Sequence, residues 1–255
     1  MNNDLWCLAR HCYGFGSWGG KYVFIGPEQG GTHQKMTKHA DAFRKLDLDK
    51  DGLCDCREFH QEIYEPGDRD WHRSEPPPTP LQSTWHYLIL TLMSYEGMIK
   101  SDKPLPGQTP SEYQRPFRKY QRDEWGRSNG ETCVIERSGI NAKSFVESAA
   151  LRASFSQAEC AEFEAILRRR VEHITARIRE GKAEFVVIYS KSQHSYWGDL
   201  RKAGSRICES QNEIFRVGPT LVAFTESRGP NNPRPGPWFQ LGQELRKHRT
   251  NKHAD

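Results

Sequence analysis

The chain has 255 residues, of which 27% are charged, with a formal net charge of +4 and a mean hydropathy of −0.84. No apolar run approaches the roughly 20 residues that cross a bilayer, and Met1 to Arg10 lacks the layout of a signal peptide, so we expect neither a membrane span nor a leader. Seven cysteines, an odd number in a long chain, indicate reduced thiols in a cytoplasmic protein and argue against a disulfide scaffold.

Hydrophobic spacing predicts an alternation of strands and helices along the chain. A strand at 21–25 precedes helices at 36–46 and 57–64, a proline-rich loop at 65–80 and a buried helix at 81–99. A second proline-rich loop, 101–118, leads to a strand at 132–135 and to a long helix within 144–180, capped at Ser154 or Ser156. A strand at 184–189, a helix at 198–208, a strand at 221–224, a loop at 226–237 and a helix at 238–247 complete the order.

This alternation predicts one α/β domain over 1–248, followed by a flexible tail at 249–255. We expect three layers, with helices on both faces of a short, mainly parallel four-stranded sheet. In such folds the functional residues gather at the carboxyl ends of the strands.

An acidic stretch lies between the helices predicted at 36–46 and 57–64. Asp at alternate positions, a Gly at the turn and a closing Glu resemble a twelve-residue EF-hand loop, which implies Ca²⁺ ligands at Asp47, Asp49, Asp51, Leu53 (through its carbonyl), Asp55 and Glu58. Cys54 departs from the β-branched residue usual at the eighth position, and the chain has no second loop of this kind. An acidic connector between two helices is the alternative.

The cysteines could in principle form a four-thiolate metal site. Cys7 and Cys12 are five residues apart, whereas Cys54 and Cys56 form a C-x-C pair, which is a poor chelating geometry for one ion. The spacing favours buried thiols.

The ends of the predicted strands carry the strongest pattern. Gly26-Pro27-Glu28-Gln29-Gly30 closes the first strand, Glu136 closes the second, and the fourth leads into Thr225-Glu226-Ser227-Arg228. With the W-F-x-x-L-G-x-E-L helix that follows, this order resembles the uracil-DNA glycosylase superfamily over about residues 13–246. Two positions depart from that family, because its closing His is absent and Glu136 stands where uracil-specific members carry Asn.

The resemblance implies catalytic positions at Glu28, Glu136 and Ser227. Glu28 would position the attacking water and stabilise positive charge on the sugar, or, as the alternative, only bind the amides of its own glycine turn. Glu136 would accept a hydrogen bond from an exocyclic amine, or, as the alternative, pair with Arg137 or Lys143 in solvent. Substrate or DNA contacts are implied for Gly26, Pro27, Gln29, Gly30, Gly31, Phe15, Ser190, Lys191, His194, Arg228, Asn231 and Arg234.

The expected function is therefore that of a monomeric DNA glycosylase that flips out a base and hydrolyses its N-glycosidic bond without a required cofactor. Glu136 favours a cytosine-like or bulky modified base, such as those of phage DNA, over plain uracil. A calcium-binding EF-hand protein with an interaction role and an inactive glycosylase-like DNA-binding protein are the alternatives.

Overall fold

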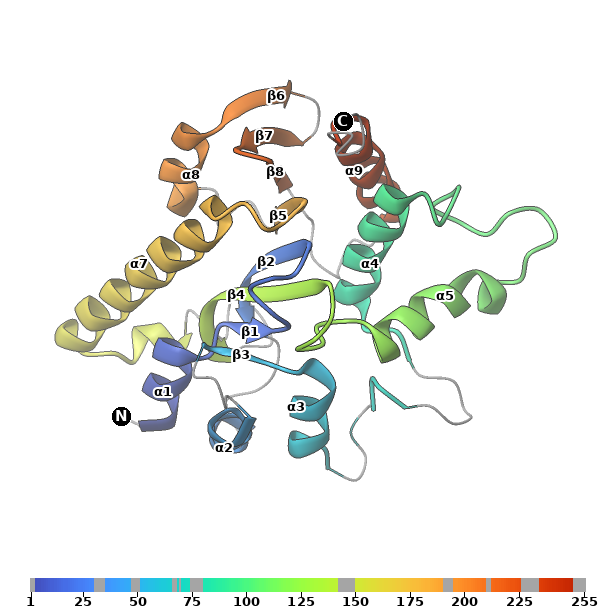
Figure 1. The fold of residues 1–255 in the computed structure, drawn as a ribbon. Coiled ribbons are helices and arrows are strands. Elements are labelled where there is room, and N and C mark those ends of the chain that lie inside the picture. Colours follow the sequence, from blue (N-terminus) through green and yellow to red (C-terminus); the bar gives the residue numbers. More distant parts are fainter. Residues whose placement is uncertain are drawn as a thin grey trace.

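The computed structural model is built on one eight-stranded β-sheet with helices on both faces (Figure 1). It describes residues 3–29, 35–46, 51–65, 68, 70–73, 80–141, 150–189, 195–209, 212–225 and 234–249.

The sheet has the order β3-β1-β4-β2-β5-β8-β7-β6. Its centre is β4-β2-β5-β8, in which each strand runs parallel to its neighbours. The strands are β1 (Gly14–Phe15), β2 (Tyr22–Gln29), β3 (Leu53–Cys54), β4 (Thr132–Asn141), β5 (Phe185–Tyr189), β6 (Ser205–Glu209), β7 (Glu213–Val217) and β8 (Thr220–Thr225).

The α/β class is confirmed, whereas the predicted extent of the sheet is wrong. All four predicted strands exist and form the parallel centre, but two more strands extend each edge. At one edge β1 pairs antiparallel with β4 and parallel with β3. At the other, β7 and β6 continue from β8 as an antiparallel meander, so the sheet is mixed.

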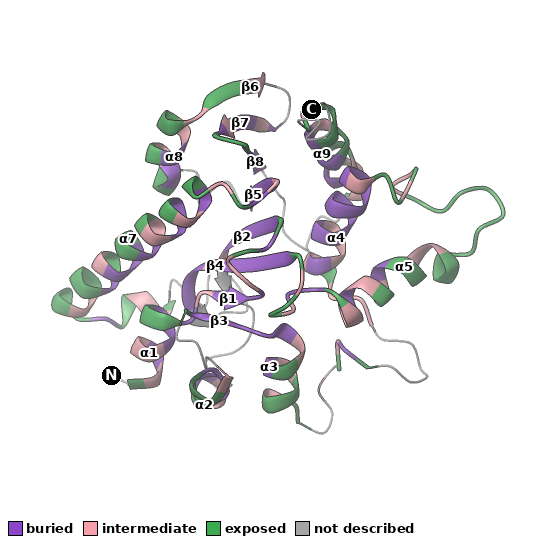
Figure 2. Cartoon of the chain, viewed as in Figure 1, coloured by how far each residue is buried: buried purple, intermediate pink, exposed green. Residues whose placement is uncertain are grey.

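Eight helices with assigned bounds pack around this sheet within the described residues. On one face α4 and α9 cover the even-numbered side chains of β2, and on the other α7 and α8 cover the odd-numbered ones (Figures 1 and 2). The helices are α1 (Asn3–His11), α2 (Met36–Leu46), α3 (Cys56–Ile63), α4 (Ser83–Glu96), α5 (Pro110–Asp123), α7 (Gln157–Arg179), α8 (Gly198–Ala203) and α9 (Pro235–Lys247).

Burial on both faces explains why the central strands read as continuous apolar runs. Every residue of β5 is buried (Figure 2). Phe24 and Val187 face the α4 side, whereas Ile25 and Ile188 face the α7 side. The alternation of a pleated strand thus assigns the side chains to two hydrophobic clusters.

The long helix begins where the sequence predicts. Ser156 caps α7, and its side chain and that of Glu159 form a reciprocal capping box. The helices predicted at 36–46, 57–64, 81–99 and 238–247 correspond to α2, α3, α4 and α9.

Three other predictions differ from the structure. The loop predicted at 101–118 contains the start of α5, because Pro110 occupies the first helical turn and Thr109 caps it. The helix predicted at 198–208 ends at Ala203, and β6 follows. Arg249, placed in the flexible tail, forms an ion pair with Glu184 at 3.1 Å.

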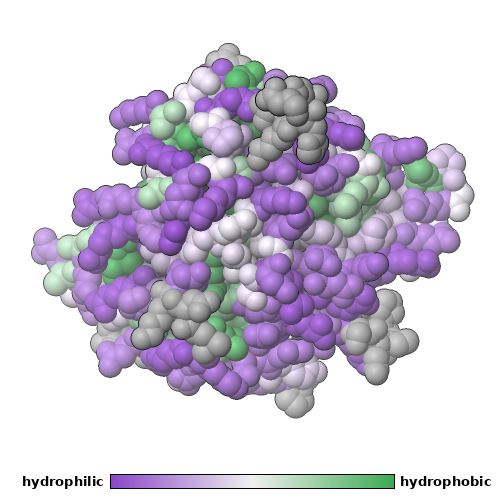
Figure 3. All heavy atoms as spheres, viewed as in Figure 1, coloured by the Kyte–Doolittle hydropathy of each residue, from purple (hydrophilic) through white to green (hydrophobic). Residues whose placement is uncertain are grey.

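The face of the molecule seen in Figure 3 is mainly hydrophilic, with small apolar patches between hydrophilic residues. Among the described residues, no helix combines the length and the apolar character needed to span a membrane.

Candidate functional site

The carboxyl ends of the four central strands lie along one edge of the sheet. Gly26 on β2 pairs with Glu136 on β4, and Ile25 pairs with Ile188 on β5, so that Tyr189 lies beside Gly26 on its other side. Thr225 on β8 pairs in turn with Tyr189. One row across the sheet therefore reads Glu136, Gly26, Tyr189, Thr225.

Gly26 leaves room for its two neighbours to meet. A Cβ built on Gly26 would come closer than 3.0 Å to both the Tyr189 hydroxyl and the Glu136 Oε2 atom. The two side chains are hydrogen-bonded, and burial, followed by the charge of Glu136 and this bond, raises the pKa of Tyr189 well above its usual value. Glu136 thus turns inward over Gly26.

Aromatic rings continue the row on the α4 and α9 side. The Tyr189 ring lies 6.4 Å from that of Trp238 in an edge-on arrangement, and Trp238 is stacked at 6.3 Å on Tyr87. The Thr91 hydroxyl donates to the Trp238 carbonyl at 3.0 Å, which fixes the start of α9 against α4. A carboxylate beside aromatic rings can hold a planar heterocycle that carries an amino group.

Arg170, a fully buried residue of α7, holds the middle of β4 from the opposite face. Its guanidinium donates to the carbonyls of Arg137 (2.8 Å), Ala9 (3.2 Å), Cys12 (2.8 Å) and Glu136 (2.7 Å). It also lies over the Tyr13 ring, and burial lowers its pKa to about 10, which leaves it charged at neutral pH. The backbone of Glu136 is therefore fixed.

The other predicted catalytic residues are described only in part. Glu28 belongs to β2, two residues beyond Gly26, and its backbone pairs with Ser138. Gln29, the last residue of β2, pairs with Asn141, and Pro27 is half-buried. The predicted positions Gly30, Gly31, Ser190, Lys191, His194, Ser227, Arg228 and Asn231 lie outside the described residues.

Two predicted contact residues lie elsewhere in the fold. Phe15, expected to stack on a base, is buried against Phe59 and His60 of α3, with ring centroids 5.3 and 5.5 Å away. Phe15 is thus part of the core and not of the Gly26 row. Arg234 is exposed, and its backbone caps α9.

The EF-hand-like segment has two helices in the expected places, α2 before it and α3 after it. Asp47 and Asp49 lie outside the described residues. Leu53 and Cys54 form β3, which pairs with β1 where an EF-hand would pair with a second hand. The Asp51 carboxylate accepts from the Leu53 amide at 3.1 Å, and Glu58 is exposed in the first turn of α3.

Asp55 departs from the expected ligand role. One of its oxygens accepts from the amides of Arg57 and Glu58, and the other accepts from the Arg127 side chain at 2.8 Å and the Ser128 amide at 3.1 Å. Burial acts to raise the pKa of Asp55, but these donors outweigh it and lower the pKa. The carboxylate caps α3 and is not turned toward the loop.

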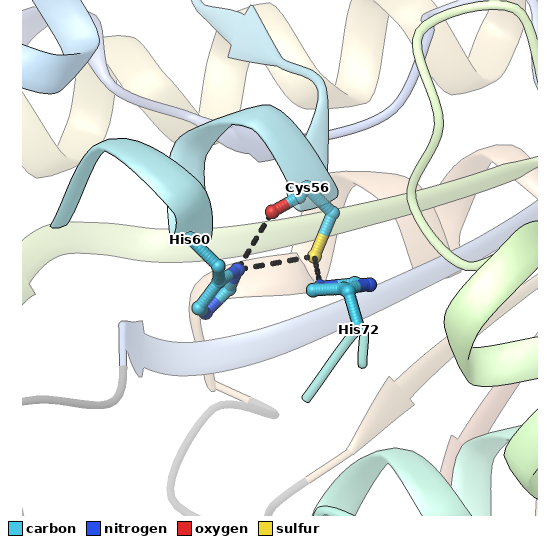
Figure 4. Close-up of side chains that lie close together, drawn as sticks. All are labelled: Cys56, His60 and His72. Atoms are coloured by element: carbon cyan, nitrogen blue, oxygen red, sulfur yellow. Dashed lines mark hydrogen bonds between the residues drawn. The ribbon is translucent and has the colours of Figure 1, made fainter. Parts of the chain in front are cut away.

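A second cluster lies near the amino end of β4, toward the opposite end of the strands from the Gly26 row. Cys56 and His60, one turn apart on α3, meet His72 from the segment before α4 (Figure 4). The Cys56 Sγ atom lies 3.6 Å from His60 Nδ1 and 3.8 Å from His72 Nε2. Thiolate and neutral imidazole are the ligands that zinc and related metals prefer, so this cluster can hold such an ion.

Comparison with known proteins adds no assignment. Neither a family model nor a curated protein matches this chain. The two clusters of side chains, at Glu136 and at Cys56, are therefore the basis for assigning a function.

The sequence reasoning did not single out Tyr189, His60 or His72. Cys56 and His60 have the i, i+4 spacing that places two side chains on one helix face, so that pair was detectable. From the sequence, Tyr189 is only the last residue of a predicted strand, because its partner Glu136 is distant in the chain.

Proposed function

We propose that this protein is a DNA glycosylase that binds a flipped base at the carboxyl edge of β4, β2 and β5. The meeting of Glu136 and Tyr189 over Gly26 carries the proposal. It is supported by the course of the chain, since β2 leads to β4 on one side and β5 leads to β8 on the other. Ligands of open α/β sheets bind where the connections diverge in this way.

Glu136 is the residue we assign to base recognition. A carboxylate has several acceptor sites, so the hydrogen bond from Tyr189 leaves capacity for an exocyclic amine. It has no donor for the O4 atom of uracil. This chemistry favours a cytosine-like base, with the rings of Tyr189 and Trp238 nearby.

Glu28 is the residue we assign to the chemical step. It would orient a water molecule whose oxygen attacks the sugar C1′ atom while the C1′–N bond breaks and the base leaves. Its backbone position on β2, directly after the Gly26 row, supports this role. No cofactor is needed for such a hydrolysis.

The test is to incubate the protein with oligonucleotides that each carry uracil, cytosine or a modified cytosine, and then to cleave abasic sites with alkali. We expect cleavage at a cytosine-type base, and a loss on the order of 10² in Glu28→Gln with the fold retained. Glu164→Gln, on the exposed face of α7, is the matched control. Absence of abasic sites with every base, or unchanged turnover in Glu28→Gln, would overturn the proposal.

Glu136→Gln tests the recognition step separately. The amide retains an acceptor but adds a donor, so activity on a cytosine-type base should fall and discrimination against uracil should relax. Both substrates need the same duplex context and salt concentration, because phosphate contacts dominate affinity. An unchanged preference would remove Glu136 as the base reader.

Calcium binding is the second candidate function, and the placement of α2 and α3 around the acidic segment favours it. Asp51 and Glu58 would be ligands from the described part of that segment, whereas the contacts of Asp55 argue against a role for its carboxylate. Calcium-dependent stabilisation without abasic-site formation would favour this function over the first.

A further inference from the structure

We propose that Cys56, His60 and His72 bind one Zn²⁺ ion, with water as the fourth ligand, and that the ion fastens the segment 70–73 to α3. The site is independent of the proposed glycosylase function, because it lies at the amino end of β4 and not at the carboxyl edge of the sheet. The Cys56 amide donates to the Gly126 carbonyl at 2.9 Å, and the Gly126 amide donates to the Thr132 hydroxyl at the start of β4.

The distances between the ligand atoms match a tetrahedral zinc site. With Zn–S near 2.3 Å and Zn–N near 2.05 Å, a tetrahedral angle gives a sulfur–nitrogen separation of about 3.6 Å. The two separations from Cys56 Sγ are 3.6 and 3.8 Å, and the three ligand atoms all lie within 4.8 Å of one another. An ion can thus enter with small side-chain shifts.

Both histidines lie in surroundings that disfavour a positive charge on the ring. Burial lowers the pKa of His72 to about 4, with the nearby His60 adding to the effect and a hydrogen bond to the Arg122 backbone opposing it. Burial also lowers the pKa of His60. A neutral imidazole offers one ring-nitrogen lone pair to an ion, and His60 Nδ1 and His72 Nε2 are the nitrogen atoms that face the Cys56 sulfur.

Burial raises the pKa of the Cys56 thiol well above its usual value. Zinc binding forms an S–Zn bond and releases the thiol proton to water. His60 Nδ1 also lies 2.7 Å from the Cys56 carbonyl and must give up that contact. This exchange costs little, because the helical amide four residues later remains as the donor to that carbonyl.

The side chains in and around the cluster favour a metal ion that binds sulfur and nitrogen, and they do not suit calcium. The Trp85 ring meets the rings of His60 and His72 at 5.3 and 6.0 Å, and Phe15 packs against His60. Near the cluster, Asp55 is occupied by its cap and by Arg127, and Asp70 accepts from the His72 amide at 2.9 Å. One thiolate and two imidazoles in an aromatic environment suit Zn²⁺ or Co²⁺, whereas Ca²⁺ requires oxygen ligands.

The first test is the metal content of the full chain, purified without chelator and with any affinity tag removed. We expect one zinc per chain. Replacement of zinc by Co²⁺ should produce the near-ultraviolet thiolate-to-cobalt charge-transfer band and visible bands of tetrahedral intensity. A thiol–imidazole hydrogen bond without metal gives neither band, so their absence together with substoichiometric zinc would overturn the proposal.

Variants assign the ligands. Cys56→Ser should lose the charge-transfer band, and His72→Gln should keep it but bind cobalt at least tenfold more weakly. The matched controls are Cys54→Ser, a buried thiol on β3, and His86→Gln, an imidazole on α4, both of which should bind as the native protein does. A band that persists at full strength in Cys56→Ser would contradict the assignment. If a variant fails to fold, the cobalt spectrum of the native protein still shows whether a thiolate binds the metal.

Excess Ca²⁺ is the final control. It should leave the cobalt spectrum unchanged, because Ca²⁺ requires oxygen ligands and the cluster offers sulfur and nitrogen. Displacement of cobalt by Ca²⁺ would show that the bound metal is in the acidic segment and would overturn the zinc site.

Discussion

The hydroxyl of Tyr189 donates a hydrogen bond to the carboxylate of Glu136 across the backbone of Gly26. The two residues are 53 positions apart in the chain (189 minus 136), and only the parallel pairing of β4 and β5 with β2 brings them together. Together with Gly26, they are the part of the candidate site whose contacts the structure describes most completely.

Tyr189→Phe should impair base excision while leaving the ring in place. A hydrogen bond to a charged group contributes about 1.5–3 kcal/mol, so single-turnover excision should fall by roughly 10- to 160-fold. Tyr22→Phe is the control, since its hydroxyl donates to Glu96 at 2.7 Å near the other end of the same sheet face. Equal rates for native protein and Tyr189→Phe would show that this hydrogen bond does not position Glu136 for recognition.

Gly26→Ala should displace both partners at once. The added methyl group overlaps the Tyr189 hydroxyl and Glu136 Oε2, so we expect a loss of about 1–3 kcal/mol in the free energy of unfolding and excision as low as in Glu136→Gln. Gly198→Ala is the control, because a Cβ there meets nothing within 4 Å. Urea unfolding and the alkali assay measure the two effects. A fully active Gly26→Ala protein would place the base elsewhere.

Arg170→Met should destabilise the fold strongly, because four carbonyls lose their donor. Unsatisfied buried acceptors make the expected loss about 3 kcal/mol or more, measured as a lower urea midpoint at constant slope. The exposed neighbour Arg168→Met should stay within about 0.5 kcal/mol of the native protein. A loss under 1 kcal/mol for Arg170→Met would mean that water replaces the guanidinium.

The sequence predicts the centre of the sheet better than its edges. Apolar runs mark the four central strands because those strands are buried on both faces. The two-residue strands β1 and β3 are too short to show any periodicity. In 198–208, apolar residues fit a helix as well as a strand, and the transition at Gly204 depends on pairing with β7.

Proline was misleading in α5. Pro110 starts the helix, and Thr109 with Glu112 forms a capping box, yet the density of prolines in 101–118 predicts a loop. At the candidate sites, residue types were informative but proximity was not. The sequence marks Glu136 as a strand-end carboxylate and Cys56 as half of a C-x-C pair, whereas their partners Tyr189 and His72 depend on tertiary structure.

Calcium should stabilise the protein if the acidic segment binds it. At a free concentration one hundred times the dissociation constant, the free energy of unfolding should rise by about 2.7 kcal/mol. Glu58→Gln should remove the effect, whereas Glu62→Gln, which only loses an exposed ion pair with Lys45, should retain it. Superimposable melting curves with millimolar calcium and with chelator would leave residues 47–58 as a connector.

Acidic pH should destabilise the fold through His86. Burial, with nearby Arg118 adding to it, lowers the pKa of His86 to about 4 from a usual 6.5. Between these two pKa values the unfolded chain binds a proton at His86 and the folded chain does not. The contribution of neutral His86 to the free energy of unfolding is therefore complete above pH 6.5 and is lost as pH falls to about 4. The loss is on the order of 3 kcal/mol.

Urea midpoints measured between pH 7.5 and pH 4.5 check this expectation. His86→Gln should fall less steeply than the native protein, whereas His11→Gln, an exposed change on α1, should follow it. Parallel curves for native protein and His86→Gln would assign the acid sensitivity to other groups.

The packing of α9 on α4 has a consequence for synthesis on the ribosome. Gly242 approaches the Thr91 carbonyl so closely that a Cβ cannot fit, and Leu88, Leu241 and Leu245 are completely buried. α4 ends at residue 96 and α9 begins at 235, so at about 5–20 residues per second the nascent chain presents an uncovered apolar helix for roughly 7 to 28 seconds. Until α9 has been synthesised, the apolar face of α4 that it covers is therefore open to chaperones and to aggregation.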